Sequence, residues 1–409
     1  MKRFAQFLNE EKNVHMVHIE DLVILGGVKG VRSAINYLRS LRDMLEGNTS
    51  SSVNVTVKWD GAPAIFAGYD PSDGKFFVAK KGIFNKNPKV YKTDSDIDAD
   101  TSGDLNAKLK LALKYLPEIG IKGVIQGDFL YSKNDLKKED IDGESYITFH
   151  PNTIVYAVPE KSKIAQRILR SQLGVVWHTT YRGDSFEGMS ASFGEKIADS
   201  LKPSSNVWFV DAVYKDVSGS ATFTKDESQE VTSALNNTLK IFNSLNRKVV
   251  EGIGSDNDRS IRVSAFINSK VKQNERIRDT KSFVKDMVRY ISDYYQKEAD
   301  KKKTEKGKQA QYEKRDQVLS YFNEVGESNV ANLFDLYNLL IDAKLMILRK
   351  LDSTKSVGTF LKTKDGFEVT GQEGFVAIDR LGKNAVKLVD RLTFSKANFD
   401  PSYIKGWQR

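Results

Sequence analysis

A lysine at the end of an alternating stretch is the residue of this sequence best suited to covalent chemistry. Apolar and polar residues alternate from 53 to 58, and a period of two is typical of a half-buried strand. The strand ends at Lys58, and Asp60 and Gly61 follow it closely. A lysine fixed at a strand end, with a carboxylate two residues further along, suits a nucleophile better than a solvated surface charge does.

The tetrad Lys58-Trp59-Asp60-Gly61 resembles the K-x-D-G motif of the covalent nucleotidyltransferases. This superfamily contains the ATP-dependent DNA and RNA ligases and the mRNA-capping enzymes. The resemblance implies that Lys58 attacks the α-phosphate of ATP and carries AMP as a phosphoramidate. It also implies that Asp60 and Gly61 contact the nucleotide, and that ATP and Mg²⁺ are the cofactors.

Further motifs resemble those of the same superfamily and follow in its order along the chain. They are a strand ending at Lys81, an apolar strand over 124–131 with Gly127-Asp128, an aromatic strand over 153–159 with Tyr156, the run Glu373-Gly374-Phe375-Val376, and Lys387 in the strand 385–389. Together the resemblance covers residues 50–215 and 366–399. It implies that Lys387 acts with Lys58 in catalysis.

Several of these residues have more than one interpretation. Asp128 is expected either to bind the metal or to contact the ribose hydroxyls, and Glu373 either to bind the metal or to contact the adenylate. Tyr156 stacks on the purine in one interpretation and is a core tyrosine in the other. Lys81 contacts the nucleotide or belongs to an ordinary lysine-rich hairpin.

The chemistry of an amine nucleophile adds a requirement that does not depend on the resemblance. At pH 7 a lysine with an unperturbed pKa near 10.4 is neutral in only about one molecule in 2,500. Removal from water or nearby cations must lower that pKa. Lys80, Lys81 and Lys387 supply such charge if the fold brings them close, and a bound Mg²⁺ adds more.

The sequence departs from the superfamily pattern in three respects. Val389 stands where a second alternating lysine is usual, and Asp128 stands where glutamate is commoner. Only 22 residues follow Lys387, too few for the OB-fold of DNA ligases and capping enzymes. We therefore expect an RNA ligase, or alternatively a degenerate nucleotidyltransferase fold that serves as a nucleic-acid-binding or phage structural module. Nucleotidyl transfer to a protein or a small molecule is a third interpretation.

The chain also resembles a family of tailed-phage proteins that share the stretch Lys58-Trp59-Asp60-Gly61-Ala62-Pro63-Ala64. This resemblance implies a source but no activity. If the protein is phage-encoded, its expected location is the cytoplasm of the host.

Composition places limits on partners and compartment. The chain of 409 residues has no cysteine and a formal net charge of +9, which excludes disulfides and thiolate metal sites and favours polyanionic partners. We expect nucleic acid as a partner, RNA rather than DNA. A lysine-rich helix over 296–316 is the alternative source of the charge. No apolar run is long enough to span a membrane, so a cytoplasmic protein is expected.

The periodicity along the chain predicts an α+β protein with an antiparallel-sheet nucleotidyltransferase core of the ATP-grasp-like ligase type. We expect an N-terminal helical segment at 1–50, the first part of the core at 51–225, a helical subdomain at 226–352, and the final strands and tail at 353–409. Residues 53–92 are expected to form a β-meander, 85–104 a mobile loop and 105–117 a helix. All four histidines, His15, His18, His150 and His178, are expected to be structural.

Overall fold

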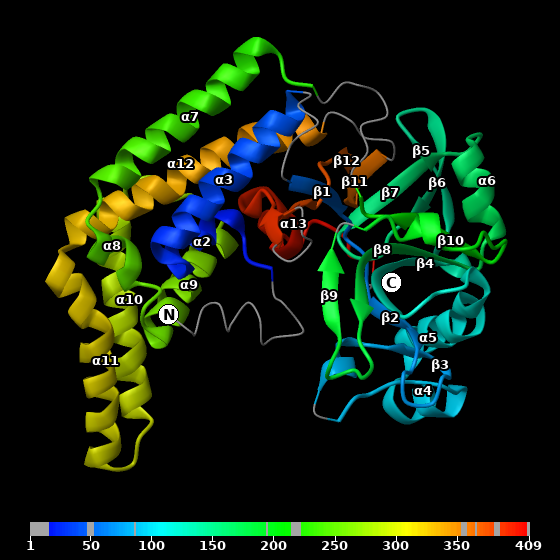
Figure 1. Ribbon diagram of the computed structural model, residues 1–409, viewed down its shortest axis with the longest axis horizontal. Helices are drawn as coiled ribbons and strands as arrows, with labels where there is room; N and C mark the ends of the chain where they lie inside the picture. Colours follow the sequence, from blue (N-terminus) through cyan, green and yellow to red (C-terminus); the bar gives the residue numbers. More distant parts are fainter. Residues whose placement is uncertain are drawn as a thin grey trace.

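Three sheets and a body of helices make up the structure (Figure 1). The computed structural model describes residues 16–46, 53–85, 87–193, 195–213, 222–352, 358–364, 366–379 and 385–406. It is a mixed α and β protein in which nearly all strand pairs are antiparallel; β10 and β8 are parallel. His15 lies outside the described residues.

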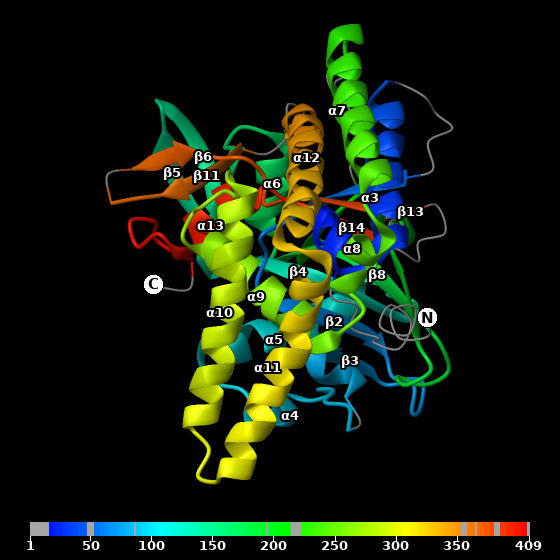
Figure 2. The same cartoon turned by 90° about the vertical axis from the view of Figure 1, so that its left-hand side faces the viewer.

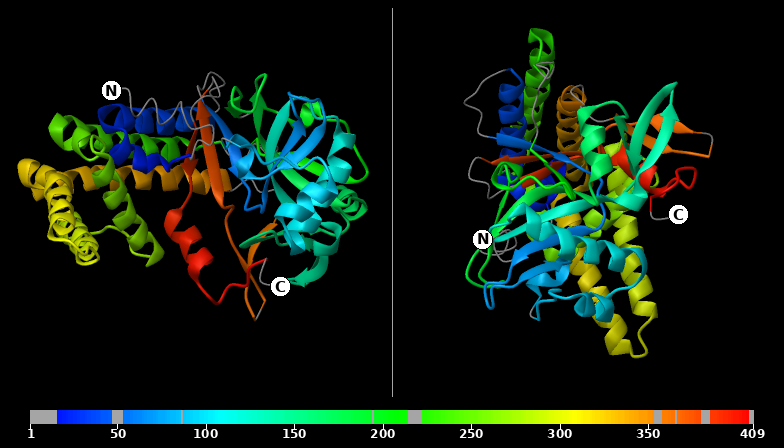
Figure 3. Two further views of the ribbon diagram at one scale, coloured as in Figure 1. Left: turned by 90° about the horizontal axis from the view of Figure 1, so that it is seen from below. Right: turned by 90° about the vertical axis from the view of Figure 1, so that its right-hand side faces the viewer.

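The smallest sheet joins strands from opposite ends of the chain. Its order is β1 (Val53–Lys58), β13 (Gly374–Asp379) and β14 (Ala385–Leu388). In the view from below it lies between the helices and the two larger sheets (Figure 3). The strand predicted at 53–58 is therefore confirmed, but the meander predicted over 53–92 is wrong, because β1 pairs with β13 instead of β2.

A six-stranded sheet carries the next part of the chain. Its order is β10 (Val207–Asp211), β8 (Leu173–Arg182), β4 (Val124–Ser132), β2 (Ala64–Tyr69) and β3 (Phe76–Ala79), with β9 (Ser190–Phe193) paired to β8. One face packs on α4 (Asp94–Asp100), α5 (Gly103–Tyr115) and η3 (Leu116–Ile119). Alternate sheet residues such as Ile65, Ala67 and Phe129 make this contact, as the period of a strand requires.

The segment expected to be a mobile loop at 85–104 contains helix α4. Thr93 caps it, because its side chain accepts a hydrogen bond from the Asp96 amide while the Asp96 carboxylate accepts one from the Thr93 amide. This capping box satisfies the free amides of the first turn. The helix predicted at 105–117 is confirmed by α5 and η3.

A five-stranded sheet packs against the other face of the six-stranded one. Its order is β12 (Phe367–Val369), β11 (Gly358–Lys362), β7 (Ile154–Pro159), β6 (Glu144–Phe149) and β5 (Lys137–Ile141). Phe149 and Tyr156 meet Tyr131 and Trp208 in the shared core, which α6 (Lys163–Arg170) also covers. The remaining short elements are η2 (Lys81–Phe84), η4 (Lys133–Asp135), η5 (Ala198–Ser200) and α13 (Arg391–Phe399).

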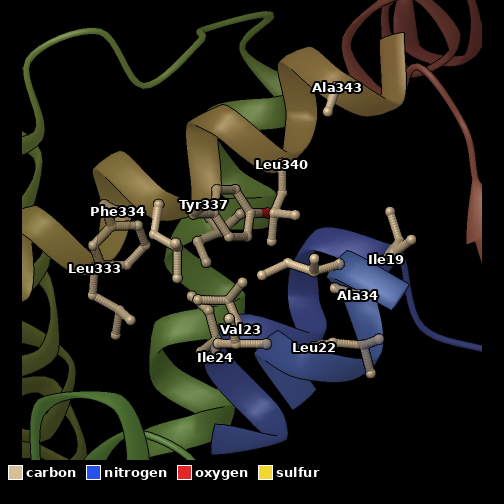
Figure 4. Close-up of a cluster of buried hydrophobic side chains, with 14 of the residues drawn as sticks. Ile19, Leu22, Val23, Ile24, Ala34, Leu333, Phe334, Tyr337, Leu340 and Ala343 are labelled. Atoms are coloured by element: carbon tan, nitrogen blue, oxygen red, sulfur yellow. The ribbon is translucent and has the colours of Figure 1, made fainter. Parts of the chain in front are cut away.

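The helical body combines the N-terminal helices with the helices of the second half of the chain. It consists of η1 (Ile19–Asp21), α2 (Leu22–Leu25), α3 (Gly27–Leu45), α7 (Lys225–Ser244), α8 (Arg247–Gly252), α9 (Asn257–Lys272), α10 (Thr280–Asp300), α11 (Glu305–Val325) and α12 (Glu327–Asp352). Figure 4 shows Leu22, Val23 and Ile24 facing Tyr337 and Leu340 of α12. Within the described ranges, no helix combines the length and apolar composition needed to cross a bilayer.

Helices α10 and α11 form a hairpin that projects beyond the rest of the body (Figure 2). The connection between them, residues 301–304, is fully exposed and contains three lysines. The charged exposed segment expected at 296–316 is therefore two helix ends joined by a short turn.

A buried ion pair fastens the N-terminal segment to α12 and to the end of the small sheet. The Lys344 ammonium donates to both oxygens of Glu20, each at 2.9 Å, and to the Val389 carbonyl oxygen at 2.8 Å. Beside it, Arg391 donates to Asp21 at 2.9 Å. Three hydrogen bonds satisfy all donors of the ammonium, which is what allows a lysine to be buried.

We expect Lys344→Met to lower the free energy of unfolding by about 3–5 kcal/mol, because the buried Glu20 carboxylate loses both hydrogen bonds from the ammonium and keeps only Arg391, at 3.8 Å. The exposed Lys138, which pairs with Glu160 at 2.7 Å, provides the control, since losing a surface pair changes stability by less than about 1 kcal/mol. Chemical denaturation of both variants checks this. If Lys344→Met and Lys138→Met lowered the free energy of unfolding equally, the buried pair would contribute no more to stability than the exposed one.

Candidate active site

Lys58 and Glu373 meet at the edge of the small sheet. Lys58 pairs with Gly374 across β1 and β13, and the Lys58 ammonium forms an ion pair with the Glu373 carboxylate. The Glu373 side chain is 10% exposed and that of Lys58 27%. Gly374 is needed beside them, because a Cβ there would lie 2.5 Å from the Leu388 carbonyl oxygen. The structure thus brings together two predicted site residues that are far apart in sequence.

The Glu373 carboxyl has an unusual protonation equilibrium. Its pKa is raised to about 7, chiefly because the group is buried. The Lys58 charge opposes this shift, while Asp60 and Asp128 reinforce it. A carboxyl that titrates near neutrality can accept a proton and give it up again at physiological pH.

Asp60 holds the turn after β1 against the start of β7. Its carboxylate accepts hydrogen bonds from the Thr153 and Ile154 amides at 2.7 and 2.8 Å, and from the Asn152 side chain at 2.8 Å. With 4% exposure, Asp60 serves as an anchor for β7 rather than as the nucleotide contact predicted from sequence. Its effect on the site is to fix the direction in which Lys58 leaves the sheet.

Tyr156 lies in the core between the two large sheets. Its side chain is fully buried and packs on Phe149 and on Trp59, with ring centroids 5.4 and 4.8 Å away. Its hydroxyl accepts a hydrogen bond from the Asp60 amide at 2.6 Å. The predicted stacking of Tyr156 on a purine is therefore wrong, and the core interpretation is right. Trp59, next to Lys58 in sequence, is half-buried and packs on Tyr156.

Asp128 lies against the turn that carries Gly61. A Cβ on Gly61 would come within 2.5 Å of the Asp128 Cβ, so only glycine lets β4 approach this closely. Burial raises the pKa of Asp128, and the charges of His178 and Lys58 oppose the shift. His178 Nε2 lies 3.7 Å from Asp128 Oδ2. Sequence reasoning missed this histidine, because its nearness depends on the β4–β8 register.

Lys387 and Lys81 surround the pair with further positive charge. Lys387 pairs with Val376 of β13, and its pKa is lowered by burial first and then by Lys58 and Lys81. Lys81 is exposed at the start of η2 and acts on Asp128 as well. The structure therefore gathers Lys58, Lys81 and Lys387 around Asp128 and Glu373.

A cleft of about 930 Å³ between α7 and α12 reaches Glu373 and Gly374 from the helical side. Its lining includes Asp226, Glu230, Asp342 and two arginines. Because carboxylates outnumber arginines there, the cleft does not suit a polyanion. An anionic ligand is better accommodated on the side of the small sheet that carries the lysines.

Two carboxylates, Asp128 and Glu373, are the predicted Mg²⁺ ligands. Among the described residues no group of three or more His, Asp or Glu side chains could hold a metal by itself. Mg²⁺ in nucleotide enzymes is bound by one or two carboxylates together with phosphate oxygens and waters. Asp128 raises the pKa of Glu373, so the two carboxyls lie near each other, and both are of the type that such a site requires.

We expect Gly61→Ala to destabilise the protein by about 1–3 kcal/mol, because the added methyl group overlaps Asp128 and lies 3.1 Å from the Phe129 carbonyl oxygen. Gly82→Ala is the matched control: its Cβ would meet its nearest neighbour at 3.5 Å, so we expect a change below about 1 kcal/mol. Urea unfolding of the two variants measures the difference. A Gly61→Ala protein as stable as Gly82→Ala would contradict the close contact.

Comparison with known proteins gives one family and no relative of known activity. No curated protein and no solved structure matches the chain. A family model described as a family of unknown function, DUF6267, matches residues 13–403, which is almost the whole sequence. The chain therefore belongs to the DUF6267 family.

Proposed function

We propose that this protein is a covalent nucleotidyltransferase that carries AMP on Lys58 and acts as an ATP-dependent polynucleotide ligase. The observation that carries the proposal is the contact between Lys58 and a buried carboxyl, Glu373, whose pKa is about 7. A nucleophilic amine needs a partner that removes its proton, and this carboxyl is matched to that task at neutral pH.

The proposed first step balances as follows. Glu373 takes a proton from the Lys58 ammonium, and the free amine attacks the α-phosphorus of ATP. The nitrogen–phosphorus bond forms as the bond from the α-phosphorus to the bridging oxygen breaks. The nitrogen gives up a second proton in this step, which leaves with the pyrophosphate, while Glu373 releases the first proton to water; one proton is therefore released overall. AMP then passes to an oxygen of the acceptor, which restores the Lys58 amine.

Other residues bind and orient in this proposal. Trp59 offers a half-buried ring beside the nucleophile, and Lys81 and Lys387 attract the phosphates. Because Glu373 acts as the base, Mg²⁺ would be held by Asp128 together with phosphate oxygens and waters, and would neutralise charge on the departing pyrophosphate. His178 lies beside the Asp128 carboxylate, with Nε2 3.7 Å from Oδ2.

The net charge of the chain and its resemblance to RNA ligases suggest the chemical class of the acceptor. A net charge of +9 supports a polyanionic partner, and the resemblance to RNA ligases favours RNA over DNA. The resemblance to tailed-phage proteins would place the reaction in the host cytoplasm.

A second candidate function rests on one specific observation. Val389 stands where the superfamily pattern has a lysine, and its carbonyl oxygen binds Lys344 of the helical body. A degenerate nucleotidyltransferase fold that binds nucleic acid, or forms part of a phage structure, would keep this architecture without the reaction.

Intact mass after incubation with ATP and Mg²⁺ separates the two functions. We expect a gain of one AMP that is lost in Lys58→Ala and retained in the exposed-lysine control Lys138→Ala, because Lys58 contacts Glu373 whereas Lys138 pairs with Glu160. GTP is tested in parallel, and a gain with GTP alone would indicate capping chemistry. Folded protein that starts unmodified and gains nothing with either nucleotide would leave the binding module as the better assignment.

The pH dependence of adenylation tests Glu373 directly. Below its pKa the carboxyl is protonated and cannot accept a proton, so the single-turnover rate should rise as pH passes upward through about 7. Glu373→Gln should slow the step by about 10²–10⁴-fold and remove this rise. The same pH profile in both proteins would exclude Glu373 as the base.

A further inference from the structure

The N-terminal segment adds itself to the edge of the small sheet next to Lys387. The Lys387 amide donates to the Val17 carbonyl oxygen at 2.9 Å, and His18 and Lys387 form a parallel bridge. Residues paired in this way present their side chains on the same face of a sheet. The side chain of His18 is therefore a neighbour of Lys387.

The same face also carries Lys58. Thr56 pairs with Val376, and Val376 with Lys387; Lys58, two residues after Thr56, points the same way. The opposite face, with Val55, Phe375, Ala377, Val386 and Leu388, is buried in the helical core. Lys58, Lys387 and His18 thus share the face that turns away from the helices.

Two polar groups on this face lack partners. His18 Nδ1 is buried without a hydrogen bond, and no ion pair among the described residues involves the half-buried Lys387. Neighbouring cations differ in this respect, since Lys344 pairs with Glu20 and Arg391 with Asp21. A buried polar group that makes no hydrogen bond is unfavourable unless a ligand supplies the missing partner.

The electrostatic setting selects the charge of that ligand. Burial lowers the pKa of His18 well below its ordinary value, and Arg391, Lys344, Lys387 and Lys58 lower it further. The ring is therefore neutral at pH 7 and retains one N–H donor. Lys58, Lys344 and Arg391 are each paired with a carboxylate, whereas Lys387 forms no ion pair among the described residues. A neutral donor beside such a lysine favours an anion.

The nearness of the three side chains indicates which part of a nucleotide fits. The charge of Lys58 acts on the pKa of both His18 and Lys387, so these side chains lie near one another. An in-line displacement places the leaving group opposite the attacking atom. A triphosphate whose α-phosphorus lies at Lys58 can therefore direct its terminal phosphates toward Lys387 and His18.

We propose that His18 and Lys387 form a binding site for a diphosphate group, which receives the β- and γ-phosphates of ATP and the pyrophosphate released from it. Its place in the reaction rests on the proposed function, whereas the anion site itself does not. The N-terminal segment, outside the region that resembles ligases, thus contributes His18 to the site as a positioning residue.

Titration calorimetry with inorganic pyrophosphate, on the full chain carrying Lys58→Ala, tests the site without adenylation. We expect His18→Leu and Lys387→Met each to weaken pyrophosphate binding at least tenfold. His18→Gln keeps an N–H donor and should stay within about threefold of the parent. Lys138→Met, the exposed-lysine control, should bind as the parent does. Thermal unfolding checks that each variant is folded.

Absence of pyrophosphate binding in the parent, or unchanged binding in folded His18→Leu or Lys387→Met, overturns the proposal. If His18→Leu does not fold, Lys387→Met decides. Adenylation by the wild-type chain is measured separately. His18-dependent binding without adenylation would reject the proposed function and retain the site. If His18→Leu is adenylated with an unchanged KM for ATP and binds pyrophosphate as the parent does, the site is rejected and the proposed function is retained.

Discussion

The pairing of β1 with β13 is the constraint on which the rest of the structure depends. The pairing closes a chain segment of more than 300 residues. The entropic cost of closing such a segment grows only slowly with its length, and the paired strands offset this cost by burying one face of the sheet in the helical core. The Val57 amide also donates to the Ala212 carbonyl oxygen, which ties β1 to the larger sheets. The small sheet therefore joins the two halves of the molecule, and Lys58 stands at this junction.

The site combines a buried acid with a lysine in direct contact, and each needs the other. Removing Glu373 from water favours its protonated form, while the Lys58 charge favours the ionised one. The balance leaves the carboxyl near the midpoint of its titration at neutral pH. Rigid surroundings maintain this balance: Asp60 fixes the turn on β7, and Gly61 lets β4 lie against it. Neither residue needs to contact a ligand to be indispensable.

Local patterns in the sequence predicted local structure well. The alternation over 53–58 and the helical period over 105–117 both correspond to elements of the structure. The order of short motifs also indicated Lys58, Asp128, Glu373 and Lys387, which the fold brings into one region. The polarity of the aspartate-rich residues 94–100 suggested a loop, but the capping box at Thr93 starts a helix there.

What the sequence could not provide is information that spans the chain. Nothing near residue 53 identifies a partner strand more than 300 residues away, so the meander was the simpler prediction. The burial of Tyr156 depends on how two sheets pack, and the nearness of His178 to Asp128 depends on register. The sequence around His18 does not indicate that this residue lies near the site, because its position there depends on a β-bridge to Lys387.

The β1–β13 pairing also has a consequence for synthesis on the ribosome. Lys58 leaves the exit tunnel well before Glu373 and β14, which lie more than 300 residues further along the chain. At about 5–20 residues per second, roughly 15–60 seconds separate the two. During that interval Lys58 lacks its acid partner and β1 lacks its partner strand β13. The contact between Lys58 and Glu373 thus forms only after β13 has been synthesised, and a chain that stops before residue 373 does not contain it.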